Sequence, residues 1–314
     1  MFDLKKAKIL LTGGHGFLGE RVFGELIKAG AKAENISRPR SANLDLRIAA
    51  NCAKAVKGKN LVIHLAANVG GIGYNQQHPG QLFYDNAIMG INLIEAARRA
   101  KVKKFVQVGT VCAYPKIPRH IPFRENDLWQ GYPEETNAPY GLSKLILLEM
   151  LQAFRRGYGF NGIYLLPVNL YGPNDNFNPK SSHVIPALIK KFTEAVGQKK
   201  SEVTVWGTGQ ASREFLYVDD AARGIVLAAR KYNKAEPVNI GSGYEIKIKD
   251  LVRLIARFSG YRGMIIWDKT KPDGQPRRKL DVTRAKKEFG FVSAVDFQTG
   301  LKRTVEWYKK NSHK

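Results

Sequence analysis

Short, nearly continuous hydrophobic runs alternate in the first half of the chain with longer segments in which hydrophobic residues recur every three or four positions. The short runs are typical of strands buried on both faces, and the longer segments of helices that pack one side against a sheet. Strands are predicted at Lys8–Leu11, Leu61–Ala67, Phe105–Val108 and Ile163–Leu166, and helices at Phe17–Ala29, about 85–100 and about 140–156. Because strands and helices alternate, we expect an α/β fold of the Rossmann type, with a doubly wound parallel sheet.

The pattern changes after Pro167. Residues Tyr171–Asn176 combine glycine, proline, asparagine and aspartate, which favour turns, and the helices and strands beyond them alternate less regularly. No linker rich in glycine, serine or proline separates the two parts, so we expect a tight interface with a ligand cleft. The expected parts are a dinucleotide-binding Rossmann domain at 1–170 plus about 213–242, and a smaller C-terminal α/β domain that binds the substrate, at 171–212 plus about 243–314.

The composition is that of an ordinary globular protein, because 44% of the 314 residues are hydrophobic and 25% are charged. The hydrophobic runs are far shorter than the roughly 18 residues that a membrane helix needs, and no secretory signal pattern precedes Gly13. We therefore expect a cytoplasmic protein with no membrane span. The cysteines, Cys52 and Cys112, are too few for a disulfide framework or a multi-cysteine zinc site, and no metal is expected.

The charge is the unusual property, because 51 basic against 27 acidic residues give a formal net charge of +24. Such a field favours anionic partners, whether nucleic acid, a membrane surface or phosphorylated small molecules. The basic residues form short scattered groups, such as Lys101–Lys104 and Arg277–Lys279, and we interpret these as solvated faces. Nucleic acid is therefore not the expected partner, although a non-enzymatic nucleotide- or RNA-binding protein stays open as an alternative.

A glycine-rich loop follows the first predicted strand and opens the first predicted helix. It contains Gly13, Gly16 and Gly19 within Thr12–Gly19. Glycines at this spacing permit a tight turn and let a pyrophosphate approach the backbone, while the helix N-terminus offers free N–H groups to the anion. The loop, with Phe17 and Leu18 at the start of the helix, predicts a dinucleotide-binding site.

The residues at the end of the likely second strand indicate which dinucleotide binds. The acidic residue that usually holds the ribose 2′-hydroxyl, about 20 positions after the glycine loop, is absent, and Arg38 and Arg40 stand there instead. Guanidinium groups suit a 2′-phosphate, so NADP(H) is favoured and NAD(H) stays possible. Asp45 is placed to reach the adenine.

Tyr140 and Lys144 lie four residues apart at the start of an apolar helix, so both side chains face the same way. A nearby ammonium and a cationic nicotinamide stabilise a phenolate, which makes the phenol of Tyr140 a usable acid or base near neutral pH. Such pairs are common by chance, but together with the glycine loop this pair predicts a catalytic site.

Thr110 and Cys112 follow the buried strand Phe105–Val108, and residues two apart on extended backbone point the same way. Their hydroxyl and thiol are therefore expected to face the space beyond the strand's carboxyl end, where open α/β sheets bind ligands. The simpler interpretation, a capping hydroxyl and a small buried hydrophobic residue, stays open.

The helix that carries Tyr140 predicts a partner. From Leu145 to Phe154 it is apolar nearly all round, as is Leu142 before it, with only Glu149 and Gln152 polar in that run. A helix of this kind is covered on both sides. Since the sheet covers one side, we expect the other to pair with its copy in a two-fold homodimer.

Together, the glycine loop, His64–Ala67 and the Tyr140–Lys144 pair resemble the extended short-chain dehydrogenase/reductase (NAD-dependent epimerase/dehydratase) family over essentially the whole chain. Within it, the chain is similar to the members that epimerise C3 and C5 of GDP-4-keto-6-deoxy-D-mannose and then reduce C4 with NADPH, which gives GDP-L-fucose. Further motifs carry this resemblance: Asn68–Ile72, Cys112–Lys116, Asn169–Phe177, Ser182–Leu188, Trp206–Gly209, Arg213–Leu216 and Lys271–Gly274.

The resemblance implies a role for each catalytic residue. Tyr140 protonates the C4 oxygen, Lys144 holds the nicotinamide ribose and lowers the pKa of the phenol, and Thr110 binds the keto oxygen. Cys112 and His183 are the implied base and acid of epimerisation, since reversal of a centre needs a proton removed on one face and delivered on the other. The implied binding residues are Ala66 and Ala67 for the cofactor and Asn169, Lys191, Trp206 and Arg213 for the GDP-linked 4-keto-6-deoxy sugar.

The chain departs from the family pattern at three positions. Thr110 replaces a commoner serine and keeps the hydroxyl, whereas Lys191 replaces an arginine and loses bidentate geometry toward phosphate. His15 replaces an arginine that can contact the adenosine phosphate, which weakens the case for NADP. The alternative within the family is an epimerase of UDP- or dTDP-linked sugars that retains NAD.

Overall fold

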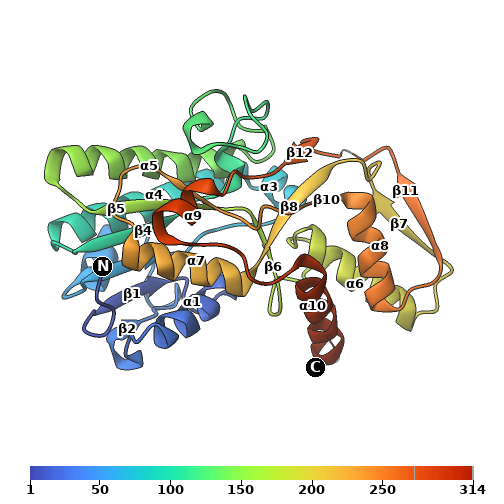
Figure 1. Ribbon diagram of the computed structural model, residues 1–314, viewed down its shortest axis with the longest axis horizontal. Helices are drawn as coiled ribbons and strands as arrows, with labels where there is room; N and C mark the ends of the chain where they lie inside the picture. The colour runs from blue at the N-terminus through green and yellow to red at the C-terminus, as the bar shows by residue number, and fades with distance from the viewer. Residues whose placement is uncertain (272, 313–314) are drawn as a thin grey trace.

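A six-stranded parallel sheet forms the centre of the N-terminal part in the computed structural model, which describes residues 1–271 and 273–312 (Figure 1). In spatial order its strands are β2 (Ile36–Ser37), β1 (Ile9–Thr12), β3 (Leu61–His64), β4 (Lys104–Val108), β5 (Gly162–Pro167) and β9 (Val238–Ile240). The neighbouring strands all pair in parallel, and the chain is wound outward from β1 in both directions, so the predicted Rossmann-type α/β fold is confirmed. Pro272, part of the predicted motif Lys271–Gly274, lies outside the described residues.

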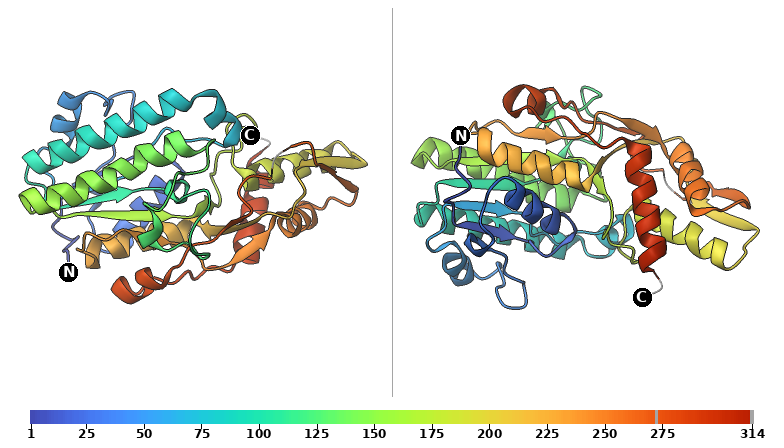
Figure 2. Two further views of the ribbon diagram at one scale, coloured as in Figure 1. Left: turned by 90° about the horizontal axis from the view of Figure 1, so that it is seen from above. Right: turned by 60° about the horizontal axis from the view of Figure 1, so that its bottom comes forward.

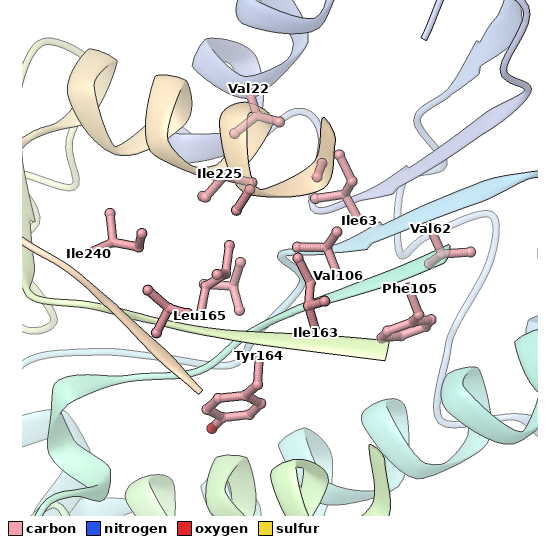
Figure 3. Close-up of a cluster of buried hydrophobic side chains, with 14 of the residues drawn as sticks. Val22, Val62, Ile63, Phe105, Val106, Ile163, Tyr164, Leu165, Ile225 and Ile240 are labelled. Atoms are coloured by element: carbon pink, nitrogen blue, oxygen red, sulfur yellow. The ribbon is translucent and has the colours of Figure 1, made fainter. Parts of the chain in front are cut away.

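Helices cover both faces of this sheet (Figure 1). On one face lie α1 (Phe17–Lys28) and α7 (Val218–Lys231), and on the other α2 (Ala49–Val56), α4 (Pro79–Arg99) and α5 (Ala138–Tyr158). Figure 3 shows Val22 of α1 and Ile225 of α7 on one side of the strands, whereas Tyr164 of β5 points to the other side. The strand residues Ile63 and Val106 between them are 0% exposed. Within the described ranges, no helix combines the length and the apolar character needed to cross a bilayer.

The C-terminal part lies to one side of the sheet (Figure 2). It has a small sheet of β6 (Asn169–Tyr171), β8 (Ser212–Tyr217), β10 (Glu245–Lys247) and β12 (Arg277–Arg278), and a separate pair, β7 (Glu202–Trp206) with β11 (Met264–Asp268). Its longer helices are α6 (Val184–Gly197), α8 (Ile248–Ser259) and α10 (Phe297–Asn311). Two shorter helices are α3 (Ile72–Gln77), near the junction, and α9 (Thr283–Phe289).

The buried hydrophobic side chains form two clusters. The larger one surrounds the six-stranded sheet, and the other lies between β8, α6, α8 and α10. β8 contributes to both, because alternate side chains of a strand point to opposite faces: Leu216 belongs to the first cluster, and Phe215 and Tyr217 to the second. The division departs from the predicted parts at Leu280, Ala285, Phe289 and Phe291, which were predicted in the C-terminal part but belong to the first cluster. The domain boundaries stay a prediction.

The predicted strand Leu61–Ala67 is shorter in the structure and ends at His64. Beyond it the chain leaves the sheet and passes against the glycine loop. A Cβ atom added at Gly13 would lie 2.8 Å from the backbone nitrogen of Ala66. The apolar run therefore continues past the strand because Ala66 packs on this loop, not because the sheet extends that far.

Two basic residues that we interpreted as solvated are buried. Lys104 is 0% exposed, and its ammonium donates to the carbonyl oxygen of Ala228 at 3.3 Å and to Oδ1 of Asn233 at 3.0 Å. Burial lowers the pKa of Lys104 to about 7. Arg278 is 9% exposed and lies beside Cys112. The prediction was wrong for both, because each lies on a strand, where alternate residues of a basic run face opposite sides.

Candidate active site

A cavity of about 950 Å³ opens at the carboxyl ends of β1, β3, β4 and β5. Ligands of open α/β sheets bind at this edge, where the connections leave in opposite directions. Most of the predicted site residues line it: Gly13, Gly16, Phe17, Leu18, Gly19, Arg40, Asp45, Ala66, Ala67, Thr110, Cys112, Tyr140, Lys144, Asn169 and His183. The fold thus gathers segments far apart in the sequence around one space.

The loop after β1 has the shape of a dinucleotide cradle. Gly13 has a φ of +67°, which L side chains rarely adopt. A Cβ atom at Gly19 would lie 2.1 Å from the carbonyl oxygen of Gly13, so only glycine lets α1 begin this close to the turn. The loop therefore fits a nicotinamide dinucleotide whose pyrophosphate lies against the N-terminus of α1.

The structure separates the two arginines predicted to meet the adenosine end of the cofactor. Arg40 lines the cavity. Arg38 lies outside the cavity lining, because its guanidinium donates to Glu20 at 2.9 Å and to the carbonyl oxygen of Gly14 at 3.2 Å, and lies 3.8 Å from the centre of the Phe23 ring. Arg38 thus supports the glycine loop from behind, and of the two arginines Arg40 is the one in the cavity lining.

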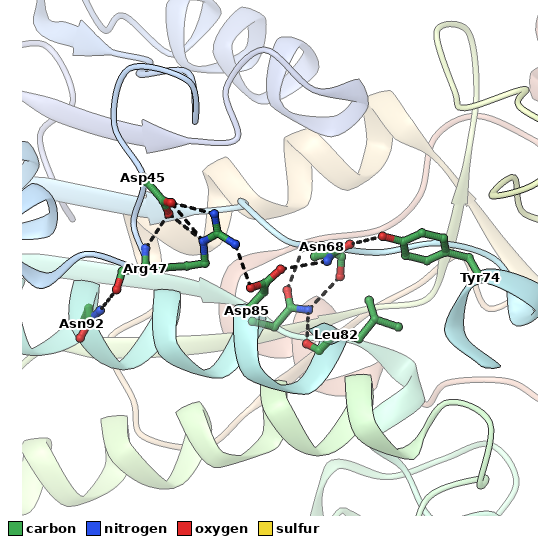
Figure 4. Close-up of polar contacts among 8 residues, drawn as sticks. Asp45, Arg47, Asn68, Tyr74, Leu82, Asp85 and Asn92 are labelled. Atoms are coloured by element: carbon green, nitrogen blue, oxygen red, sulfur yellow. Dashed lines mark hydrogen bonds and ion pairs between the residues drawn. The ribbon is translucent and has the colours of Figure 1, made fainter. Parts of the chain in front are cut away.

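Asp45 lines the cavity, but its carboxylate is already engaged. Figure 4 shows Arg47 between Asp45 and Asp85, at 2.8 Å and 3.2 Å respectively. The hydrogen bonds from Arg47 lower the pKa of Asp45. The network continues from Asp85 to Asn68 at 3.1 Å, and from Asn68 to the hydroxyl of Tyr74 at 3.0 Å. It therefore joins the wall near Asp45 to helix α3.

Tyr140 and Lys144 lie on the first turns of α5 and are 9% and 2% exposed. Burial raises the pKa of Tyr140 well above its usual value and the nearby Cys112 adds to this, whereas a hydrogen bond with Thr110 acts in the opposite direction. Burial lowers the pKa of Lys144 to about 8. The expected lowering of the phenol's pKa by Lys144 is therefore not supplied by the chain alone, because burial disfavours both charged forms.

A close approach of α5 to the turn after β4 brings phenol and thiol together. A Cβ atom at Gly141 would lie 2.3 Å from the carbonyl oxygen of Cys112, so the glycine after Tyr140 is required for this contact. The hydroxyl of Tyr164 donates to the carbonyl oxygen of Lys144 at 2.9 Å and holds α5 against β5. The short motif around Tyr140 thus supplies both the reactive group and the means to place it.

Thr110 and Cys112 both line the cavity, but not because they share an extended backbone. Thr110 is extended, whereas Val111–Ala113 form a 3₁₀ turn. The hydroxyl of Thr110 accepts a hydrogen bond from the backbone nitrogen of Cys112 at 3.2 Å and caps this turn. On its other side the thiol faces a cation, with Nη1 of Arg278 3.7 Å from Sγ. The predicted location is correct, and the predicted geometry is corrected to a capped turn.

His183 reaches the cavity from the C-terminal part, at the residue that precedes α6. Its loop is joined to the N-terminus of α3 by a hydrogen bond of 2.9 Å from the nitrogen of Gly71 to the carbonyl oxygen of Ser181. His183 is exposed by solvent accessibility, and partial desolvation of its ring lowers its pKa, which favours the neutral imidazole. Asn169, at the start of β6, lines the same cavity. Thiol and imidazole thus enter from different segments, as predicted for a pair that flanks a sugar ring.

Three predicted substrate residues lie outside this cavity lining. Lys191 donates to the carbonyl oxygen of Thr204 at 2.9 Å, and Trp206 is 66% exposed at the end of β7. Arg213 of β8 lies opposite Arg278 of β12 in the parallel register. Burial and the charge of Arg278 lower the pKa of Arg213 to about 10. Since two neighbouring cations repel each other, this pair forms a site that an anion would stabilise.

The polar residues at or beside the cavity that were not predicted as site residues include Asn75, Asn137, Asp175 and Arg278. Burial raises the pKa of Asp175 to about 7. Three of them had a usable signal, because Asp175 lies inside a predicted motif and Asn75 and Asn137 lie close to one. For Arg278 the only signal was its position between two other basic residues.

Comparisons with known proteins show which family and which fold this chain resembles. A family model, described as the NAD dependent epimerase/dehydratase family, matches residues 9–241. The chain is 38% identical over 311 residues to probable GDP-L-fucose synthase 1 of Oryza sativa subsp. japonica, which covers 98% of this chain and 93% of that protein. It is 36% identical over 318 residues to the GDP-L-fucose synthase of Escherichia coli (strain K12), with 98% of each protein covered.

A solved structure extends the likeness to three dimensions. The crystal structure of a GDP-L-fucose synthetase from Naegleria fowleri bound to NADP has a TM-score of 0.86 at 28% identity, over 100% of this chain and 97% of that one. Sequence match, fold and cavity all give the same assignment. This chain belongs to the NAD dependent epimerase/dehydratase family.

Proposed function

We propose that this protein is an NADP-dependent epimerase/reductase that acts on GDP-4-keto-6-deoxy-D-mannose, or a closely related GDP-linked 4-keto-6-deoxy sugar, and forms GDP-L-fucose or the corresponding GDP-deoxysugar. The observation that carries the proposal is the convergence of Tyr140, Cys112 and His183 on the cavity that the glycine loop also lines. The printed names of the relatives support the GDP-linked sugar.

The thiol and the imidazole suit epimerisation. A 4-keto group acidifies the hydrogens on C3 and C5, because the electron pair left by proton removal is delocalised onto the keto oxygen. We assign Cys112, as the thiolate, to remove a proton, and His183, as the imidazolium, to deliver one to the opposite face. The electron pair returns from the oxygen to carbon when the new C–H bond forms, and the centre is inverted.

The phenol suits the reduction of C4. NADPH held at the glycine loop would supply the hydride for this carbon. We assign Tyr140 to deliver a proton to the C4 oxygen, which Thr110 also contacts. Burial raises the pKa of Tyr140 and so keeps the phenol protonated, as a proton donor must be. Lys144, whose pKa is about 8, is assigned to hold the nicotinamide ribose and support the phenol.

The two arginines that lie opposite each other on β8 and β12 suit the diphosphate of the substrate. Arg213 and Arg278 present neighbouring cations, and Arg278 also lies 3.7 Å from the thiol of Cys112. A sugar diphosphate joins its phosphate to C1, which lies two or three bonds from the reacting carbons C3, C4 and C5. A diphosphate held by these arginines would therefore place the pyranose over the thiol.

Arg40 supports NADP over NAD, and its replacement tests this choice. Arg40→Ser should raise KM for NADPH by roughly 10- to 100-fold and leave KM for NADH nearly unchanged, because a charged hydrogen bond to the 2′-phosphate is lost. Steady-state kinetics with both cofactors measures this split. Arg38→Ser is the comparison, since Arg38 is engaged with Glu20. Equal losses with NADPH and NADH in Arg40→Ser would contradict a 2′-phosphate contact.

The homodimer stays a proposal, and its proposed contact surface is α4 rather than α5. α4 packs along α5 within the subunit, so the sheet is not the only cover for the apolar helix. Tyr84 and Ile91 of α4, seven residues apart on one face, are 61% and 38% exposed. We propose that this face meets its copy across a two-fold axis. Sedimentation at micromolar concentration should show a dimer, and Tyr84→Glu with Ile91→Glu a monomer; a wild-type monomer would contradict the proposal.

A panel of sugars tests the proposed function. The purified protein is incubated with NADPH and with GDP-, UDP- or dTDP-linked 4-keto-6-deoxy sugars, and the loss of NADPH absorbance is followed. We expect stoichiometric oxidation with the GDP-linked sugar. Epimerisation of a UDP- or dTDP-linked sugar without net oxidation would instead support an epimerase that retains NAD.

A further inference from the structure

The short helix α3 carries Asn75 into the cavity wall, between the elements that bear the phenol and the imidazole. The N-terminus of α3 is hydrogen-bonded to the loop that precedes His183. On the other side, Nδ2 of Asn75 donates to Oδ1 of Asn137 at 3.0 Å, just before the helix that carries Tyr140. Asn75 is 4% exposed and lines the cavity. It therefore lies where a sugar between His183 and Tyr140 would be held.

A chain of hydrogen bonds determines which way round the amide of Asn75 lies. The carboxylate of Glu134 accepts hydrogen bonds and donates none, so the amide nitrogen of Asn137 faces it, at 2.6 Å. The oxygen of Asn137 is then turned to accept from Nδ2 of Asn75. Oδ1 of Asn75 is thus the free end of this series of hydrogen bonds, and the protein fixes its orientation as an acceptor.

This acceptor is unused by the protein. Across residues 1–271 and 273–312, no donor lies within hydrogen-bonding distance of Oδ1 of Asn75, although the atom is shielded from solvent. Buried polar atoms in folded proteins are as a rule paired, so an open one at a cavity wall points to a ligand. An acceptor selects a donor, such as a hydroxyl. A keto oxygen and an ionised diphosphate have no hydrogen to offer it.

We propose that Asn75 is a specificity-determining residue that accepts a hydrogen bond from a ring hydroxyl of the substrate sugar. This inference rests on the proposed function and deepens it, because the donors next to the reacting carbons of such a sugar are its C2 and C3 hydroxyls. A hydrogen bond from one of them fixes the rotation of the pyranose in the cavity. C3 and C5 are then held between Cys112 on one face and His183 on the other.

The test compares one variant across three sugars. Asn75→Leu removes the acceptor at nearly constant volume, and kcat/KM is measured with the parent GDP-linked sugar and with analogues that lack the C2 or the C3 hydroxyl. Relative to wild type, the variant should lose about 10- to 100-fold with the parent and with the analogue that keeps the recognised hydroxyl. With the other analogue the loss should be no more than about twofold, because no hydrogen bond is left to remove.

Gln76 is exposed on the same helix. Gln76→Leu is therefore the matched control, and it should keep the wild-type kcat/KM with every sugar. Asn75→Ala asks the same question if Asn75→Leu does not fold. An equal loss with all three sugars would give Asn75 a purely structural role and overturn the inference, as would no loss with any of them. A wild-type protein that turns over none of these sugars would overturn the proposed function, and the inference with it.

Discussion

Tyr140→Phe should lower the rate of NADPH oxidation by about 10²- to 10⁴-fold, the range that a positioned general acid contributes. The substitution removes one hydroxyl and keeps the ring in its buried site, so the fold and the cofactor cradle are preserved. The hydroxyl is the group that hydrogen-bonds with Thr110 and lies near Cys112. The measurement is the loss of NADPH absorbance with the GDP-linked 4-keto sugar at saturating cofactor.

Two controls make this prediction specific. Tyr158→Phe is the same substitution on the same helix, at a side chain that is 62% exposed, and should keep the wild-type rate. Tyr140→Phe itself should still exchange the C3 and C5 hydrogens with solvent, because its thiol and imidazole are untouched. Oxidation of NADPH at the wild-type rate in Tyr140→Phe would show that another group protonates the C4 oxygen.

Cys112→Ser and His183→Asn should each impair exchange of the C3 or C5 hydrogens with solvent deuterium, by about 10²- to 10⁴-fold. Serine preserves the size of the side chain and the turn capped by Thr110, but a hydroxyl does not form an anion near neutral pH as readily as a thiol does. Asparagine keeps a polar side chain at the end of α6 but cannot deliver a proton. Proton NMR of the sugar in deuterium oxide, without NADPH, isolates this step from reduction.

The other cysteine supplies a matched control for this experiment. Cys52 is buried in the hydrophobic core outside the cavity lining, so Cys52→Ser should leave exchange intact in the folded protein. Normal exchange in both Cys112→Ser and His183→Asn would remove epimerisation from the proposed function. Loss in only one of them would mean that the group left in the other variant exchanges the hydrogen on its own face, without inversion of the centre.

The sheet and the glycine loop could be predicted from the sequence because both depend on local pattern. Buried parallel strands read as continuous apolar runs, and the glycine spacing satisfies a turn whose steric limits are visible at Gly13 and Gly19. The prediction failed where a residue type was explained by a contact other than the predicted one. The run after His64 is apolar because Ala66 packs on the loop, and Arg38 turns to Glu20 and Phe23 rather than to the cavity.

The parts of the site that the sequence did not predict depend on contacts between distant segments. Arg278 reaches Cys112 only because β12 pairs with β8. β12 has two residues, which are too few to show the alternating pattern that predicts a strand. Asn75 is oriented by Asn137 and Glu134 across the cavity wall. The position of Thr110 and Cys112 was correct for a different reason than the one given, because a capped turn replaces extended backbone. Motifs locate reactive groups, and tertiary contacts decide their direction and their support.

One incubation tests most directly the central claim, that a phenol, a thiol and an imidazole act on one sugar in a single cavity. The wild-type protein, NADPH and GDP-4-keto-6-deoxy-D-mannose are mixed in deuterium oxide, and the product is examined by NMR while NADPH is followed by absorbance. The account predicts deuterium at both C3 and C5 and one NADPH oxidised for each sugar converted. A reduced product that keeps its original hydrogens at C3 and C5, or no oxidation of NADPH at all, would contradict it.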